Sequence, residues 1–159
     1  MAADIDERDR EILRILQEDA NRSYREIGRE LGCPVTTVYS RVKKLEETGV
    51  IKAYKTVLDA SRVGLPTTAF ILVRVKFREP GAREPYDFHR IASEISRLHG
   101  VQELHMMAGE WDFLVKIRAR DSGEVGGFVM DRLRLVEGVD RCLTCMVFET
   151  VKESADIPI

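Results

Sequence analysis

The sequence predicts an α+β protein built from two small modules, and three observations support this prediction. Residues 1–60 contain three short helical patterns, residues 61–68 concentrate turn formers, and residues 69–159 alternate between strand and helix patterns. A chain of 159 residues has room for two such modules but not for many domains. We therefore expect an N-terminal helical domain, a linker and a C-terminal mixed domain with these bounds.

Two helices open the first module. Asp6 or Asp9 can cap a helix over residues 6–19, and its apolar positions share one face: Ile12, Leu13, Ile15 and Leu16. Ser23 and Glu26 have the spacing of a capping box, in which each side chain accepts from the other residue's backbone amide. This pair predicts the start of a second, short helix.

A turn and a third helix follow. Gly32 ends the second helix, and Pro34 suits the start of the third. Apolar residues then recur at helical spacing up to Gly49: Val35, Val38, Val42 and Leu45. Residues 50–59 alternate apolar and polar side chains like a strand or short hairpin. The first module is therefore expected to be a winged helix-turn-helix.

The second module follows the order strand, helix, strand, strand, helix, strand. The expected strands are residues 69–77, 101–108, 111–119 and 139–151, and the expected helices are residues 85–98 and 121–136. Gly109 and Glu110 supply the tight turn between the two middle strands. This order predicts an antiparallel sheet with both helices on one face, a ferredoxin-like sandwich.

Three of these strands are apolar on both faces. Consecutive apolar residues occupy positions 70–73, 113–115 and 146–148. Because the helices cover only one face, the economical cover for the other is the same sheet of a second copy, which gives a two-fold dimer. A monomer whose strands are flanked by loops is the alternative.

The third helix and the segment after it are basic, although the net charge of the chain is -2. Residues 22–55 carry eight bases and four acids, and no acid lies between Leu31 and Leu45. Hydroxyl groups near a helix start, with cations further along, suit the major groove of double-stranded DNA. An ordinary solvated surface is the alternative. The candidate DNA-binding residues are Thr36, Thr37, Tyr39, Ser40, Arg41, Lys43, Lys44, Lys52 and Lys55.

Composition and motifs argue against several other classes. No stretch approaches the roughly 20 apolar residues of a membrane span, and the start MAADIDERDR lacks the pattern of an export signal, so we expect a cytoplasmic protein without a membrane partner. Cys142 and Cys145 form a CxxC on a strand, where their side chains point to opposite faces. We predict no catalytic residue, metal or cofactor, because phosphate loops, nucleophile elbows and histidine ligand spacings are absent from the sequence.

The same stretches resemble a known family. DERDREILRILQEDANRSYREIGRELG and VTTVYSRVKKLEETGVIKAYKTVLD are similar to the winged helix-turn-helix of the Lrp/AsnC (feast/famine) transcriptional regulators. VQELHMMAGEWDFLVKIRARD and GVDRCLTCMVFETVKE resemble that family's ligand-binding domain. The resemblance implies a sequence-specific regulator with its recognition helix at residues 35–47. It also implies a homodimer that assembles into larger rings, and an amino acid or similar small effector bound near the dimer-to-dimer contacts.

The family's glycine-x-aromatic-aspartate turn falls on residues 109–112. Backbone amides beside Gly109 are open to a carboxylate, Asp112 suits an ammonium group, and Met106, Met107 and Trp111 suit the lining of a small pocket. An ordinary hairpin, with a core tryptophan and an aspartate that caps local amides, is the alternative. The candidate effector-binding residues are Met106, Ala108, Gly109, Glu110, Trp111 and Asp112, together with Thr144, which only the resemblance indicates.

The chain also departs from the family pattern. Pro34 stands where the family usually has a serine cap, and residues 77–86 form a longer, proline-broken loop. Gly126 and Gly127 fall inside the last helix, so either that helix begins later or a partner backbone approaches closely. Two other functions stay open: an architectural DNA-binding protein without an effector, and an enzyme like the sirohaem decarboxylases, which resemble this architecture but act on a tetrapyrrole.

Overall fold

A computed structural model of the chain describes residues 4–78, 81 and 84–159. The chain forms two compact units, which divide between Val57 and Leu58. Residues 152–159, which the sequence assigned to the second module, group with the first unit. Across the described residues, no helix combines the length and apolar character needed to cross a bilayer.

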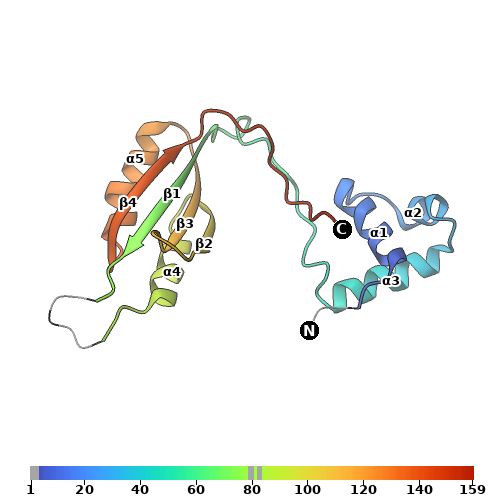
Figure 1. The fold of residues 1–159 in the computed structure, drawn as a ribbon. Helices are drawn as coiled ribbons and strands as arrows, with labels where there is room; N and C mark the ends of the chain where they lie inside the picture. Colours follow the sequence, from blue (N-terminus) through green and yellow to red (C-terminus); the bar gives the residue numbers. More distant parts are fainter. Residues whose placement is uncertain (1–3, 79–80, 82–83) are drawn as a thin grey trace. The chain divides into compact units, whose positions relative to one another are not determined.

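The first unit consists of three helices, as predicted: α1 (Glu7–Glu18), α2 (Tyr24–Glu30) and α3 (Val35–Glu47) (Figure 1). Asp6 caps α1 in a capping box with Asp9, and Ser23 caps α2 in a capping box with Glu26. The helices bury a small apolar cluster that draws on all three of them: Ile12, Ile15, Leu16, Ile27, Val38 and Val42. Burial of these side chains holds α3 against the other two helices.

The turn between α2 and α3 depends on two glycines. Gly32 adopts a φ of 63°, a left-handed conformation that side chains other than glycine rarely accept. The amide of Cys33 donates to the carbonyl of Gly28 at 2.9 Å, and a Cβ placed on Gly28 would lie 2.7 Å from the carbonyl oxygen of Cys33. The tight approach of the two helices therefore requires glycine at position 28.

The strand or short hairpin predicted for residues 50–59 is absent. Residues 52–59 form no helix or strand, and Figure 1 draws them as a coil. Ile51 still packs on the helical cluster, and the Tyr54 hydroxyl donates to Glu46 at 2.9 Å, but Val57 is 91% exposed. Apolar and polar side chains alternate here, yet no other described segment forms a ladder with these residues, and a strand needs such a partner.

The second unit has the predicted βαββαβ order. Its strands are β1 (Thr67–Val75), β2 (Val101–Met106), β3 (Phe113–Ala119) and β4 (Val139–Met146), and its helices are α4 (Phe88–Ser96) and α5 (Ser122–Asp131). The sheet has the order β2-β3-β1-β4, with antiparallel pairs throughout. Both helices contribute to one core with the sheet, so they cover the same face (Figure 1).

Two predicted elements end five residues early, and the other ends lie closer to their predicted positions. β4 stops at Met146 instead of residue 151, because Met146 already pairs with Ala69 near the start of β1 and little of β1 is left beyond it. α5 stops at Asp131 instead of residue 136, and a short 3₁₀ turn follows at Leu133–Leu135. The change of path at Arg132 accompanies complete burial of the Leu133 side chain.

The glycines of the last helix lie within it. α5 begins at Ser122, so the alternative of a later helix start is wrong for Gly126 and Gly127. Apart from its two chain neighbours and the backbone of its own helix, a Cβ on Gly126 would meet no atom of the described chain within 4 Å. The loop at 77–86 includes residues 79–80 and 82–83, which lie outside the described residues.

The face of the sheet opposite the helices carries a group of apolar side chains, with charged residues such as Lys116 and Arg141 beside them on the same face. Residues 69, 71, 73 and 75 of β1 are buried toward α4 and α5, whereas the side chains between them point the other way. Leu143 pairs with Leu72 on this open face and is 46% exposed. We call this surface the open sheet face and define it by Phe70, Leu72, Leu114 and Leu143.

Candidate nucleic-acid interface and effector site

Helix α3 presents one buried and one exposed side. Val38, Val42 and Leu45 are buried, as the helical spacing predicts. Pro34 provides no side-chain cap, but its carbonyl accepts from the amides of Thr37 and Val38, so the first turn still closes. Four predicted DNA-binding residues are exposed on this helix away from its core: Thr36, Ser40, Lys43 and Lys44.

The polar side chains of α3 make few local contacts. The hydroxyl of Ser40 donates to the carbonyl of Thr37 at 3.0 Å, and Lys43 lies 3.8 Å from the carboxylate of Glu47. Both lysines of α3 are exposed. Exposed ion pairs of this kind are worth little in water, so the contact with Glu47 does not prevent Lys43 from binding another anion.

Tyr39 lies on the flank of α3 that meets α2. Its ring packs edge-on against Tyr24 with the centroids 6.1 Å apart, and its side chain remains 55% exposed. Lys52 and Lys55 are exposed on the coil after α3 and not on a wing. No strand carries these two lysines, so the strand-like wing that the sequence predicts for them is not observed.

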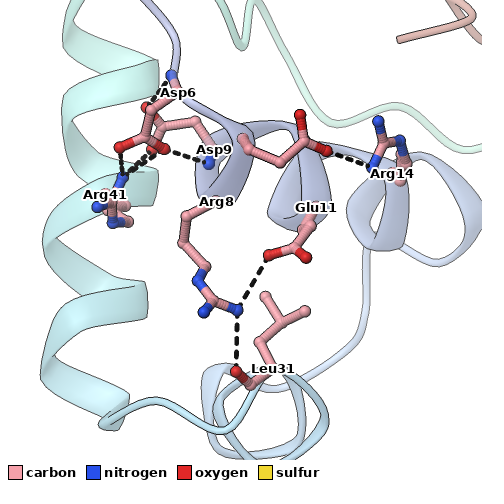
Figure 2. A network of polar contacts seen from close by, with 8 residues as sticks. Asp6, Arg8, Asp9, Glu11, Arg14, Leu31 and Arg41 are labelled. Carbon is pink, nitrogen blue, oxygen red and sulfur yellow. Dashed lines mark hydrogen bonds and ion pairs between the residues drawn. The ribbon is translucent and has the colours of Figure 1, made fainter.

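Arg41 is the one predicted DNA-binding residue of α3 that the structure places in a dense polar network (Figure 2). Its Nη1 donates to the two carboxylate oxygens of Asp6 at 2.8 and 2.7 Å and to Oδ1 of Asp9 at 2.8 Å. Arg41 is 30% exposed and Asp9 only 4%. The hydrogen bond from Arg41 is the main reason that the pKa of Asp6 lies below its ordinary value, and it raises the pKa of Arg41.

The same end of α1 also contacts α2. Nη1 of Arg8 donates to the carbonyl of Leu31, at the end of α2, and lies 2.9 Å from the Glu11 carboxylate (Figure 2). The sequence indicated Asp6 and Asp9 only as possible caps of α1. The spacing of Asp6 and Asp9 indicated the cap, but nothing in it indicated an arginine 32 residues away.

The predicted effector turn is a turn between β2 and β3. Ala108, Gly109 and Glu110 are exposed, and Gly109 has a φ of 136°. Met106 is 48% exposed, and Trp111 is half-buried and so not part of the core. The turn therefore presents open backbone and apolar side chains together.

Asp112 is engaged within its own chain. Its Oδ2 accepts from the amide of Val75 at 2.7 Å, and its backbone amide donates to the carbonyl of Val73. The alternative that the sequence left open was a cap of local amides, whereas the amide that Asp112 accepts from lies 37 residues away, on β1. An ammonium ligand would share this carboxylate with the end of β1.

The structure does not bring Thr144 to the turn. Thr144 lies on β4, where it pairs with Ile71 of β1, and β1 separates β4 from β3 in the sheet. The three cysteines are free thiols, and the part of the chain that the structure describes holds no group of three or more histidine, cysteine, aspartate or glutamate residues that suits a metal ion.

Comparisons with known proteins match both units. The AsnC-type helix-turn-helix domain matches residues 5–46, and the Lrp/AsnC ligand binding domain matches residues 68–157. An uncharacterized HTH-type transcriptional regulator of Pyrococcus abyssi is 39% identical over 96% of this chain and 99% of its own length. The HTH-type transcriptional regulator FL11 of Pyrococcus horikoshii is 33% identical over 100% of this chain and 99% of its own.

A solved structure has the same fold. The transcriptional regulator NMB0573 of Neisseria meningitidis, crystallised as an L-Met complex, superposes with a TM-score of 0.87 over 98% of this chain and 97% of its own, at 25% identity. These relatives are transcriptional regulators and not enzymes, which excludes the decarboxylase alternative.

Proposed function

The chain belongs to the Lrp/AsnC family of transcriptional regulators, and from this premise we propose that it binds specific sequences of double-stranded DNA through α3. The single observation that carries the proposal is the exposed side of α3, where Thr36, Ser40, Lys43 and Lys44 stand free of the helical core. Hydroxyl groups there suit base edges, and the two lysines suit phosphates. Thr37, Tyr39, Lys52 and Lys55 remain candidates at the borders of this surface.

The salt dependence of DNA binding tests this proposal. Replacing Lys43 and Lys44 together by glutamine should weaken binding to every duplex and should lower the slope of log affinity against log salt by about 0.9 for each phosphate that is no longer neutralised. The matched control is Arg97→Gln, which removes an exposed charge from the second unit. An unchanged slope in the double variant would argue against α3 as the DNA-binding element.

We further propose that the second unit binds an amino acid at the turn of residues 109–112. Exposed backbone at Gly109 suits the carboxylate of such a ligand, and Met106 and Trp111 offer apolar contact. The L-Met complex of the Neisseria meningitidis regulator supports this class of ligand. Since the turn alone is exposed and shallow, a second copy of the chain would complete the site.

A thermal-shift screen of the twenty amino acids tests the effector proposal. A ligand that binds the native state raises the unfolding temperature, and a hit should then change the affinity for DNA. Trp111→Ala should remove the shift while leaving DNA binding without ligand intact. If no amino acid gives a shift or changes DNA affinity, the architectural alternative without an effector is favoured.

We propose that the working form is a homodimer paired through the open sheet face, which assembles further, and that it acts in the cytoplasm, where it meets DNA. Leu143 is exposed on this face, and Phe70, Leu72 and Leu114 are only partly buried within the described chain. A dimer also sets two copies of α3 at a fixed spacing, which suits a DNA site with two halves.

A further inference from the structure

Arg41 lies at the edge of the buried stripe of α3, directly before Val42, which is completely buried. Its guanidinium group reaches the first turn of α1, where Figure 2 shows it between the carboxylates of Asp6 and Asp9. Three donor–acceptor distances of 2.7 to 2.8 Å make this a charge-assisted network. It joins two helices that are far apart in the sequence.

The burial of Asp9 makes Arg41 necessary at this position. The Asp9 side chain is 4% exposed, and a carboxylate so deeply buried is stable only beside a positive charge or several donors. The amide of Asp6 supplies one donor at 3.2 Å, and Arg41 supplies the charge. Loss of Arg41 would leave a buried charge without its partner.

The network also fixes the rotation of α3 about its own axis. Ser40 and Lys44 are the exposed residues one position before and three positions after Arg41. Successive helix residues project about 100° apart, so holding Arg41 against α1 sets the directions in which these two side chains leave the helix. Arg8 meanwhile holds the end of α2 through the carbonyl of Leu31. Residues 6–11 thus anchor both helices of the helix-turn-helix.

We propose that Arg41 is a positioning residue, which holds α3 at a fixed rotation against α1 through Asp6 and Asp9 and does not itself contact DNA. The inference rests on the proposed DNA-binding function and changes the role that the sequence predicts for Arg41. Its exposed neighbours on α3 meet the groove, and Arg41 keeps them aligned.

Two duplexes test the proposal: one that the wild-type protein selects from a random double-stranded library, and one of random sequence and equal length. Arg41→Gln should lower the preference for the selected duplex by about tenfold, which corresponds to the loss of one base contact. The slope of log affinity against log salt should not change. Lys44→Gln, the matched control, should keep the preference and lower the slope by about 0.9. A slope that falls in Arg41→Gln as in Lys44→Gln would overturn the proposal.

A variant of Asp6 should change DNA binding in opposite directions, depending on whether Arg41 contacts phosphate or positions α3. Asp6→Asn keeps a good N-cap acceptor but removes one of the two carboxylates that hold Arg41 and leaves Asp9 in place. If Arg41 contacted phosphate, this variant would release it and tighten binding to both duplexes, as expected for Glu47→Gln, which removes an exposed acid from α3. The positioning role instead expects a weaker preference for the selected duplex. Tighter binding to both would overturn it.

Hydrogen exchange separates failure of this inference from failure of the proposed function. Arg41→Gln and Asp6→Asn should speed exchange of the amides of residues 35–47, whereas Lys44→Gln should not. If the wild type binds neither duplex, the proposed function fails, and this measurement alone decides whether the network fixes α3. Unchanged exchange in both network variants would overturn the positioning role. Asp6→Asn carries the test if Arg41→Gln unfolds the first unit, because Asp9 still holds the arginine.

Discussion

Gly28 shows how one backbone position sets the distance between two helices. Replacing Gly28 by alanine would put a Cβ 2.7 Å from the carbonyl oxygen of Cys33, which is backbone and cannot rotate away. We expect the variant to lose about 1 to 3 kcal/mol of the free energy of unfolding of the first unit, as overpacked sites do. Circular dichroism follows the helices, and fluorescence of Trp111, the only tryptophan, follows the second unit separately.

The control for Gly28→Ala is the same substitution at a glycine with open space around it. Gly126→Ala places a Cβ in the interior of α5 where, apart from its two chain neighbours and the backbone of its own helix, no described atom lies within 4 Å. Alanine favours a helix over glycine by about 1 kcal/mol, so the second unit should become more stable by up to that amount. The unfolding transition of the second unit, followed by Trp111 fluorescence, measures this gain in stability. Loss of assembly in this variant would instead show that another copy approaches α5 at Gly126.

Residues whose partners lie three or four positions away were predictable from the sequence. The capping box of Ser23 and Glu26 and the helix stop at Gly32 are such cases, because the partner is fixed by the helix itself. The bonds from Arg41 to Asp9 and from the amide of Val75 to Asp112 cross 32 and 37 residues. Only the fold brings those groups together, so no local spacing indicates them.

At the scale of elements, the contact of α1 with α3 should respond to acid. The pKa of Asp6 in the folded chain lies below its unfolded value of 3.8, mainly because Arg41 donates to it. A group with a lowered folded pKa stabilises the native state fully above the unfolded value, and this contribution is lost as the pH falls through that value and below. The wild type should therefore lose stability over this range faster than Asp6→Asn does.

Unfolding of both proteins, followed by circular dichroism at pH 6 and at pH 3, measures that difference. The difference in the free energy of unfolding between the wild type and Asp6→Asn should narrow as the pH falls, because the unfolded chain binds a proton at Asp6 more readily than the folded chain, in which Arg41 lowers the pKa of Asp6. Lys44→Gln serves as the control, since it removes no carboxyl group. If the difference in the free energy of unfolding is the same at pH 6 and at pH 3, the ion pair between Asp6 and Arg41 does not stabilise the contact of α1 with α3.

The two strand segments that the sequence predicted wrongly share one physical reason. Residues 50–59 and residues 147–151 both have strand-like patterns, but strand pairing ends where a partner ends. A helix closes its own hydrogen bonds and needs no distant partner, so α1, α2 and α3 were predicted within one or two residues of their ends. The pattern of apolar and polar residues therefore located the βαββαβ core correctly but predicted strands beyond it that do not form.

At the scale of the whole molecule, a single added charge tests the proposed pairing of two copies through the open sheet face. Leu143 is 46% exposed and pairs with Leu72 on this face, whereas Leu135 is 75% exposed on the 3₁₀ turn after α5. Burying an unpaired carboxylate in an apolar contact is costly, so Leu143→Glu should weaken the dimer roughly 100-fold or more. Leu135→Glu adds the same charge at a more exposed position outside the face and should leave the dimer unchanged.

Sedimentation velocity over a range of concentrations measures both variants, and the same samples report the affinity for the selected duplex. A dimer binds a duplex with two half-sites more tightly than a monomer does, because α3 of the second subunit is held at a high effective concentration once α3 of the first is bound. Leu143→Glu should therefore also weaken binding to the selected duplex while keeping the salt slope per subunit, since α3 is untouched. If Leu135→Glu disperses the assembly and Leu143→Glu does not, the copies pair through the region after α5, and the open sheet face is free for another partner.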